Sequence, residues 1–293
     1  MKINEEIINL PLIHKGKVRD VYDLGQSYLM VATDRISAFD HIIPTIIPDK
    51  GKILHKLSMF WFDFVKDIIP NHIITGDFDS FPSTLKQYGY LKDRSMIVKK
   101  AKRVDIECIV RGYLAGSGWK EYKESQTVCG IKLPKGLKES SKISEPIFTP
   151  SSKEEGGKHD ENISFEETVK RVGIKTAENL KNISLSLYKR VNEYAISKGI
   201  ILADTKLEFG FYNDKLLLID EIFTPDSSRF WEIGVYKEGQ PQDSLDKQYV
   251  RDYLENIKWD KTSPAPMLPK DVVDKTLAKY INAYEKLTGR FLV

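Results

Sequence analysis

The chain has little cysteine, no marked excess of charge of one sign and no long apolar run. Only Cys108 and Cys129 are cysteines among 293 residues, so these two alone build neither a disulfide framework nor a zinc pattern. The 45 basic and 42 acidic residues leave a net charge of +3, which argues against a nucleic-acid or anionic-membrane surface. No apolar run approaches the ~20 residues that span a bilayer, and the N-terminus lacks a signal core. We expect a cytoplasmic protein without nucleic-acid or membrane partners.

The remaining composition is that of an ordinary globular protein, with 41% hydrophobic and 30% charged residues. Residue spacing predicts a hairpin over 15–33, two strands within 94–114, and helices over 51–68, 176–197, 245–257 and 271–288. The polar stretch 134–162 is expected to be a long ordered loop, a lid or a disordered insert. Because strands and helices do not alternate steadily, the pattern favours an α+β fold over a doubly wound sheet.

Two strand-like stretches carry charged residues where strands usually carry apolar ones: "LADTKLEFGF" (202–211) and "LLLIDEIFTPDSSRFW" (216–231). Alternation places Asp204, Lys206 and Glu208 on one face of the first strand. A three-residue loop would set Glu208 opposite Asp220, with Cβ atoms only ~5 Å apart, where like charges repel unless a cation lies between them. The pair therefore suits magnesium, with Lys206 beside it for an anionic oxygen. A register shifted by one residue would instead leave a solvent-facing hairpin.

Two further segments have the features of anion sites. "HKGKVRDVY" places Gly16 between basic residues, and Lys17 and Arg19 project to one face of a strand. In "VRGYLAGSGWKEY", Arg111 precedes a small-residue loop with Ser117 that leads into a helix N-terminus. An ordinary charged hairpin and a tight turn with a structural arginine are the alternatives.

Other polar residues collect at predicted strand ends, helix starts and loops, where binding residues and simple capping residues both occur. They are Asp34 and Asp40 in "ATDRISAFD", Lys50 in "PDKGKIL", His159 and Asp160 in "GKHDENIS", and Asp226 and Arg229 in "TPDSSRFW". Several anion sites, a carboxylate pair and no nucleophile with an obvious base together suit phosphoryl transfer.

The order of these motifs resembles that of a known family. "GKVRDVY", "ATDRISAFD", "IPDKGKIL", "VRGYLAGSGWKEY", "EPIFTPSSK", "HDENIS", "LADTKLEFGF" and "DEIFTPDSSRFW" occur in the order found in SAICAR synthetase (phosphoribosylaminoimidazole-succinocarboxamide synthase), over residues 15 to about 231. The form resembled is the longer one with the "FTPSSK…HDENIS" insert, so the resemblance makes this stretch an ordered site loop.

The resemblance implies a carbon–nitrogen ligase of purine biosynthesis. It would join 5-amino-4-carboxyimidazole ribonucleotide (CAIR) to L-aspartate with ATP and Mg²⁺, giving SAICAR, ADP and phosphate through an acyl phosphate. The implied fold is similar to ATP-grasp and kinase-like folds: an N-terminal antiparallel sheet domain (1–100) and a larger α+β domain (101–293), with ATP between them. The implied partners are small molecules, and the oligomeric state stays open.

The resemblance also suggests roles for individual residues. For ATP they are Gly16, Lys17, Arg19 and Glu107; for CAIR, Arg111, Ser117, Asp226 and Arg229; for catalysis, Lys206, Glu208 and Asp220, of which Glu208 and Asp220 hold magnesium; for aspartate, Asp34, Asp40, Lys50, His159 and Asp160. Two other classes remain as alternatives. A kinase acting on a phosphorylated metabolite would release ADP without aspartate, and a nucleotide-binding regulator would bind ATP without turnover.

Overall fold

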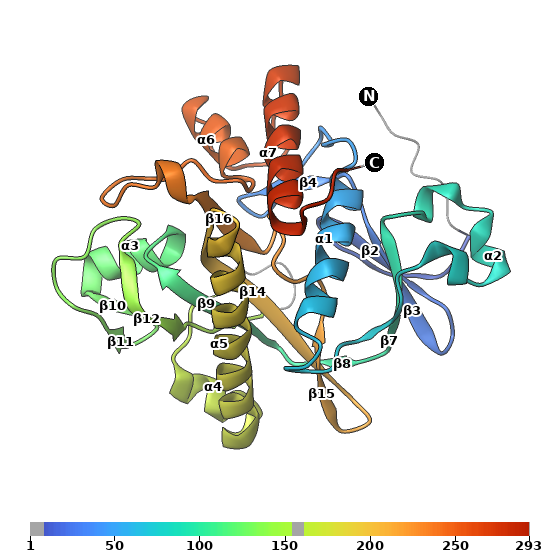
Figure 1. Cartoon of the computed structure of the whole chain (residues 1–293), viewed down its shortest axis with the longest axis horizontal. Helices are drawn as coiled ribbons and strands as arrows, with labels where there is room; N and C mark the ends of the chain where they lie inside the picture. The colour runs from blue at the N-terminus through green and yellow to red at the C-terminus, as the bar shows by residue number, and fades with distance from the viewer. Residues whose placement is uncertain (1–8, 154–160, 293) are drawn as a thin grey trace.

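A computed structural model of the chain describes residues 9–153 and 161–292. Two antiparallel sheets organise it (Figure 1). The first has five strands in the order β1 (Leu12–Lys15), β2 (Arg19–Asp23), β3 (Ser27–Ala32), β7 (Ser95–Lys99) and β6 (Ile73–Thr75). The predicted hairpin over 15–33 is confirmed as β2 and β3.

The second sheet is built around one long strand, β14 (Ile200–Tyr212). Its order is β12 (Lys142–Phe148), β9 (Ile106–Tyr113), β14 and β15 (Lys215–Ile219), with β16 (Ser228–Glu232), β8 (Lys102–Arg103) and β13 (Ser151–Ser152) paired to β14 or β9. Small hairpins join β4 (Ile36–Ala38) to β5 (His41–Ile43), and β10 (Thr127–Val128) to β11 (Ile131–Lys132). The α+β class is confirmed.

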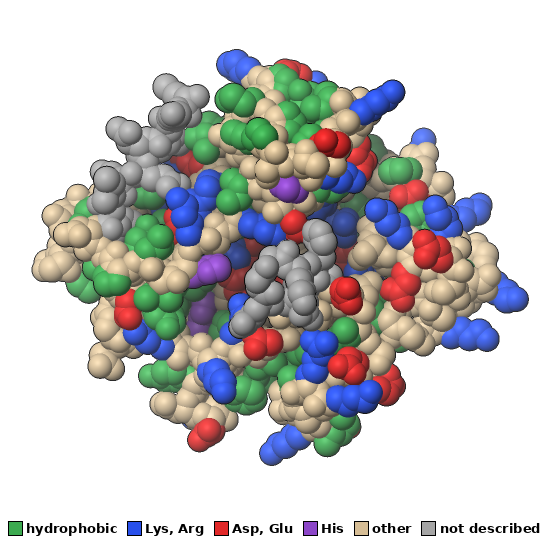
Figure 2. Space-filling model, turned by 180° about the vertical axis from the view of Figure 1, so that it is seen from behind, with side chains coloured by type: hydrophobic (Ala, Val, Ile, Leu, Met, Phe, Trp, Pro, Cys, Tyr) green, Lys and Arg blue, Asp and Glu red, His purple; other side chains and the backbone are tan. Residues whose placement is uncertain are grey.

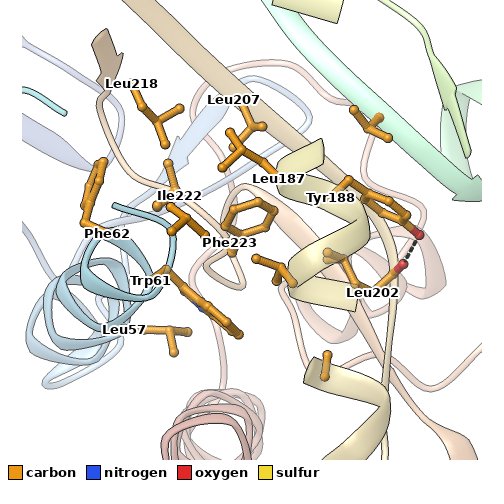
Figure 3. Packing of buried hydrophobic residues seen from close by; sticks show 14 of the residues in the cluster. Leu57, Trp61, Phe62, Leu187, Tyr188, Leu202, Leu207, Leu218, Ile222 and Phe223 are labelled. Carbon is orange, nitrogen blue, oxygen red and sulfur yellow. Dashed lines mark hydrogen bonds between the residues drawn. The ribbon is translucent and has the colours of Figure 1, made fainter. Parts of the chain in front are cut away.

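The long helices build the main core together with the second sheet, and one of them, α5 (Ile174–Ser197), lies directly on β14. The other two are α1 (Lys50–Phe64) and α7 (Lys270–Thr288); shorter ones are α2 (Ser83–Lys86), α3 (Gly116–Ser125), α4 (Phe165–Val172) and α6 (Gln248–Asn256). In Figure 3, Trp61 of α1 and Leu187 of α5 meet Phe223 among fully buried side chains. The hydroxyl of Tyr188 donates to Leu202 O at 2.5 Å, which ties α5 to β14.

Local sequence signals explain where these helices begin and end. Ser164 Oγ accepts a hydrogen bond from the backbone N–H of Glu167 (3.2 Å), which caps the start of α4. Gly289 ends α7 with φ 69°, a left-handed conformation that glycine adopts without strain. None of the helices in the described ranges is long and apolar enough to cross a membrane.

One sequence expectation changes. The stretch 134–162 is not one long loop, because β12 and β13 within it pair with β9. His159 and Asp160, predicted near aspartate, lie outside the described residues.

The first sheet comes from residues before 100, yet α1 packs with α7 and the main core rather than with that sheet alone. The division into 1–100 and 101–293 therefore stays a prediction.

Candidate active site

The charged face predicted for β14 is present. Asp204 and Glu208 are only 5% and 6% exposed on that face, and Lys206 lies between them. The alternating residues Leu207 and Phe209 point into the core and are fully buried. One rigid strand thus holds three charged side chains in a row, while its other face is fixed by hydrophobic packing.

The hairpin that follows has a different register from the one predicted. Tyr212 pairs with Lys215 across a two-residue turn, Asn213 and Asp214, whose φ values of 48° and 58° are those of a type I′ turn. Glu208 therefore pairs with Ile219, and the predicted pairing of Glu208 with Asp220 is wrong by one residue. The predicted three-residue loop overlooked that Asn and Asp both tolerate positive φ.

Glu208 and Asp220 nevertheless influence each other electrostatically, although they are not paired across the hairpin. β15 ends at Ile219, and Asp220 takes a left-handed conformation with φ 66° that turns the chain out of the ladder. The Asp220 side chain then receives Arg19 Nη2 at 2.6 Å, and Glu208 raises the pKa of Asp220. Asp220 is therefore not a solvent-facing residue on the opposite side of the hairpin, as a shifted register by itself would have made it.

Around these two carboxylates lies a set of ion pairs that we call the charged cluster. Its members are Arg19, Glu107, Lys153, Lys206, Glu208, Asp220 and Glu221. Lys206 Nζ is 2.6 Å from Glu107 and 3.4 Å from Glu208, and Lys153 Nζ also contacts Glu208. Arg19 Nη1 is 2.7 Å from Glu221.

The cations of the charged cluster set its protonation. Burial by itself raises the pKa of Glu208, but Lys206 and Lys153 outweigh burial and lower that pKa to about 2. Burial raises the pKa of Asp220, and the neighbouring carboxylates add to this against Arg19. Burial lowers the pKa of Lys206, yet Glu208 and Glu107 outweigh it, so the pKa is raised and Lys206 stays protonated.

A second site lies at the Asp204 end of β14. The Asp204 carboxylate binds Arg229 Nη1 at 2.5 Å and Arg111 Nη1 at 3.3 Å. Arg111 Nη2 also donates to Ser117 Oγ at 3.0 Å. A Cβ on Gly116 would lie 2.4 Å from Arg229 Nη2, so the loop before α3 needs glycine to approach the arginine. Three of the four residues predicted for CAIR therefore converge.

The fourth, Asp226, belongs to a different group. Lys50 Nζ is 2.6 Å from its carboxylate and the Tyr280 hydroxyl donates to it at 2.7 Å. Burial raises the pKa of Asp226, but Lys50 and Lys247 hold it well below the usual value. Burial also lowers the pKa of Lys247 to about 8. Lys50, predicted for aspartate, thus meets a residue predicted for CAIR.

A buried arginine, Arg35, fixes the Gly16–Arg19 turn. Gly16 N donates to Arg19 O at 2.7 Å, and a Cβ at Gly16 would lie 2.6 Å from that oxygen. Arg35 Nη2 donates to Gly16 O at 3.0 Å while the same guanidinium pairs with Asp20. The turn therefore presents its outer surface in a fixed shape, as a phosphate-binding loop requires.

The remaining candidates separate into an exposed pair and a structural carboxylate. Lys17 and Asp40 form an ion pair, with about half of each side chain exposed. Asp34 is buried, accepts from the Gly51 N–H at the start of α1 (2.9 Å), and pairs with Arg94 at 3.0 Å. These contacts make Asp34 an anchor of α1.

Sequence reasoning missed several contributors. Lys153 closes the quoted "FTPSSK" block and Glu221 follows Asp220 directly, so their positions gave a signal for both. Tyr280 and Lys247 gave none, because they lie in helical patterns far along the chain. Figure 2 shows Lys and Arg side chains gathered around the hollowed middle of one face of the molecule.

The described residues contain no group of three or more His, Cys, Asp or Glu side chains placed to hold a metal ion. Glu208 and Asp220 offer two carboxylates, which matches magnesium that is also held by phosphate oxygens and waters.

Comparison with known proteins decides the family. The SAICAR synthetase family model matches residues 12–286. The chain belongs to the SAICAR synthetase family. Phosphoribosylaminoimidazole-succinocarboxamide synthases from Thermodesulfovibrio yellowstonii and Geobacter sulfurreducens are 59% and 55% identical, over 95% and 96% of both chains. A SAICAR synthase from Saccharomyces cerevisiae, solved with SAICAR, is 46% identical with a TM-score of 0.90, covering 100% of this chain and 99% of that one.

A more distant SAICAR synthetase, solved with ADP, shares 25% identity with a TM-score of 0.70, covering 96% of this chain and 99% of that one. The predicted family, its fold and its enzyme class are confirmed. So is the function predicted from the sequence, the ligation of CAIR with L-aspartate in purine biosynthesis.

Proposed function

We propose that this SAICAR synthetase family member uses ATP and Mg²⁺ to activate CAIR as an acyl phosphate, on the charged face of β14. The arrangement of that single strand supports the proposal. Asp204 at one end holds the arginine pair, Glu208 at the other belongs to the charged cluster, and Lys206 lies between them. Four residues of strand separate the two ends by about 13 Å, so one substrate can bridge an anion site and a phosphoryl-transfer site.

The arginine pair is the proposed site for the CAIR phosphate. Arg111 and Arg229 share one carboxylate, so their remaining N–H groups converge beside Ser117 and the small-residue start of α3. Planar guanidinium groups match phosphate oxygens in pairs. Asp226 stays a candidate for the ribose, although Lys50 and Tyr280 already engage it.

The Gly16–Arg19 turn is the proposed phosphate loop for ATP. Lys17 lies on its exposed side, and Arg19 reaches from it to Asp220 and Glu221. Glu107, suggested by resemblance for the ATP ribose, contacts Lys206 at 2.6 Å. This contact favours a role for Glu107 in positioning Lys206.

Glu208 and Asp220 fit a magnesium ion by chemistry and by burial. Each carboxylate has a cation beside it, Lys153 for Glu208 and Arg19 for Asp220, so positive charge next to both side chains is compatible with their burial. When bound there, magnesium would offset the charge that collects when a carboxylate meets the γ-phosphate.

The reaction then follows from two displacements. A carboxylate oxygen of CAIR attacks the γ-phosphorus, the bond from phosphorus to the bridging oxygen breaks, and ADP leaves. The aspartate amine attacks the acyl phosphate carbon, phosphate leaves with the carbon–oxygen electron pair, and the nitrogen loses a proton. Lys206, held protonated by Glu107 and Glu208, stabilises the negative charge of the carboxylate being phosphorylated.

For L-aspartate, Asp40 and Lys50 remain candidates, while the buried contacts of Asp34 favour a structural role. The division of the chain at residue 100 and a cytoplasmic location also remain proposals that rest on the sequence.

The test is ADP release with Mg-ATP and CAIR, with and without L-aspartate, for the parent protein and Glu208→Ala. Full turnover only with aspartate, lost in Glu208→Ala and kept in the exposed control Glu178→Ala, would support the proposal. Equal ADP release without aspartate would identify a kinase or an uncoupled ATPase. ATP binding without turnover would identify a regulator.

A further inference from the structure

The chain leaves β15 at a residue whose backbone conformation needs support. Asp220 takes a φ of 66° directly after the strand ends at Ile219. This left-handed conformation is unfavourable for residues other than glycine, and it persists only where surrounding contacts hold it. Arg19 contacts the Asp220 side chain at 2.6 Å. The contacts to the backbone come from a different part of the chain.

A segment directly before β6 pairs with the end of β15. Leu218 N donates to Pro70 O at 3.0 Å, and Leu218 O accepts from His72 N at 3.2 Å. These two bonds make Asn71 and Leu218 a parallel bridge. Because the paired segments run in the same direction, the residue after Asn71 lies beside the residues after Leu218. The bridge thus brings His72 next to the turn at Asp220.

The His72 side chain is buried against that turn. It is 3% exposed and packs on Phe62 of α1, with 5.6 Å between the ring centroids. Burial and the nearby cations Arg19 and Lys99 lower the pKa of this imidazole to about 3, while a hydrogen bond to the Asp220 carbonyl acts in the opposite direction. A carbonyl can only accept, so a ring nitrogen donates to it. Nε2 has no partner among the described residues, which leaves Nδ1 as the donor.

The same segment is tied to the first sheet. β6 begins at Ile73, and Lys99 at the end of β7 donates from its backbone N–H to His72 O at 2.8 Å. Lys99 Nζ also donates to Asn71 O at 3.2 Å. The backbone of His72 therefore accepts a hydrogen bond from the first sheet and donates one to the second.

We propose that His72 is a positioning residue for Asp220. Its imidazole donates to the Asp220 carbonyl and its backbone fixes the end of β15, so the left-handed turn keeps the Asp220 carboxylate in the charged cluster. A neutral imidazole supplies this donor without placing another charge in the cluster. The kinetic effect of His72 rests on the proposed magnesium role of Asp220, whereas the conformation of the turn does not depend on that role.

The first test compares crystal structures of the parent, His72→Leu and His72→Asn. Leucine has no donor, whereas the amide nitrogen of asparagine takes the place of Nδ1. In His72→Leu we expect Asp220 to leave its left-handed conformation and to lose its contact with Arg19, and in His72→Asn we expect neither change. An Asp220 that stays in place in His72→Leu would overturn the inference. Equal displacement in both variants would also overturn it, because side-chain volume rather than the donor would then hold the turn.

The second test measures the free Mg²⁺ concentration that gives half-maximal ADP release, with ATP, CAIR and L-aspartate saturating. His72→Leu should raise this concentration about tenfold, the effect of losing one buried hydrogen bond. His72→Asn should restore the parent value. KM for CAIR should not change in either variant, because the arginine pair binds Asp204 at the other end of the charged face of β14.

His55→Leu is the matched control. His55 is a second buried histidine, 7% exposed, and it also makes a hydrogen bond to a backbone group, that of Gly76 in the loop after β6. His55→Leu should lower the free energy of unfolding about as much as His72→Leu does in urea, but it should leave the Mg²⁺ requirement unchanged. The same Mg²⁺ requirement in both histidine variants would show a general effect of destabilisation and refute positioning.

Asp220→Asn provides the reference for the metal. If that variant leaves the Mg²⁺ requirement unchanged, the proposed magnesium role of Asp220 is wrong, and the inference is then decided by the conformation of Asp220 in the crystal structures alone. If His72→Leu does not fold, His72→Gln replaces it, because the amide nitrogen of glutamine takes the place of Nε2 rather than that of Nδ1.

Discussion

The buried ion pair between Lys50 and Asp226 should control the stability of the protein. Its two side chains are 0% and 3% exposed, and the Nζ–Oδ2 distance is 2.6 Å. Lys50→Met keeps the length of the side chain and removes its charge. The variant leaves a buried carboxylate whose nearest remaining partners are the Tyr280 hydroxyl and Lys247.

The size of the effect follows from burial. Removing one partner of a buried pair costs about 3–5 kcal/mol, because the other charge is left uncompensated. We expect the lower end, about 3 kcal/mol, since Tyr280 still donates to Asp226. Adding Asp226→Asn to Lys50→Met removes the stranded charge and should restore most of the loss, a non-additivity that a double-mutant cycle measures.

The dependence on pH gives an independent check with a definite sign. The native pKa of Asp226 is depressed, so its pair stabilises the protein above about pH 4 and this stabilisation is lost on acidification. In Lys50→Met the pKa of Asp226 rises, and protonation relieves the stranded charge. The deficit of Lys50→Met relative to the parent should therefore shrink between pH 7 and pH 5.

The assay is urea unfolding at both pH values, with Lys270→Met as the control. Lys270 and Asp274 form a pair at 2.5 Å on the surface of α7, with 87% and 57% of the side chains exposed. The same chemical change should there have no measurable effect. The reasoning is refuted if Lys50→Met and Lys270→Met are equally stable, or if the double variant is less stable than Lys50→Met.

Three further predictions follow from the site. Arg229→Lys removes the paired N–H groups facing the CAIR site and should raise KM for CAIR about tenfold, with KM for ATP unchanged. Arg190→Lys, at an exposed pair with Asp67, is the control. Equal effects of Arg229→Lys on the KM values of both substrates would contradict the prediction. Gly16→Ala places a Cβ 2.6 Å from Arg19 O and should raise KM for ATP. Gly89→Ala, whose Cβ would meet no atom within 4 Å, should leave KM for ATP unchanged. An unchanged KM for ATP in both variants would contradict the phosphate-loop proposal. Because the pKa of Lys247 is lowered to about 8, the unfolded chain binds more protons than the native protein from about pH 8 to 10. The free energy of unfolding should therefore rise over this range, as measured by urea midpoints. If the dependence of stability on pH is the same in Lys247→Met, the lowered pKa is not that of Lys247.

The sequence alone determined the local features of the site. Alternation on β14 correctly put Asp204, Lys206 and Glu208 on one face, because the period of a strand depends only on its own backbone. Ser164 before α4 and Gly289 after α7 are local signals of the same kind, since each acts within one helical turn. The order of the motifs carried the family and the reaction.

Tertiary structure decided which charges meet. The hairpin register depended on two positive-φ residues in the turn, Asn213 and Asp214, and the return of Asp220 to Glu208 depended on its own left-handed conformation and on Arg19. Lys153 reaches Glu208 across 55 positions, and Lys50 reaches Asp226 across 176. Such pairs form only when the packed core brings distant segments together, so no periodicity in the sequence predicts them. The strand and helix patterns that build the core depend on neighbouring residues and can be predicted from the sequence.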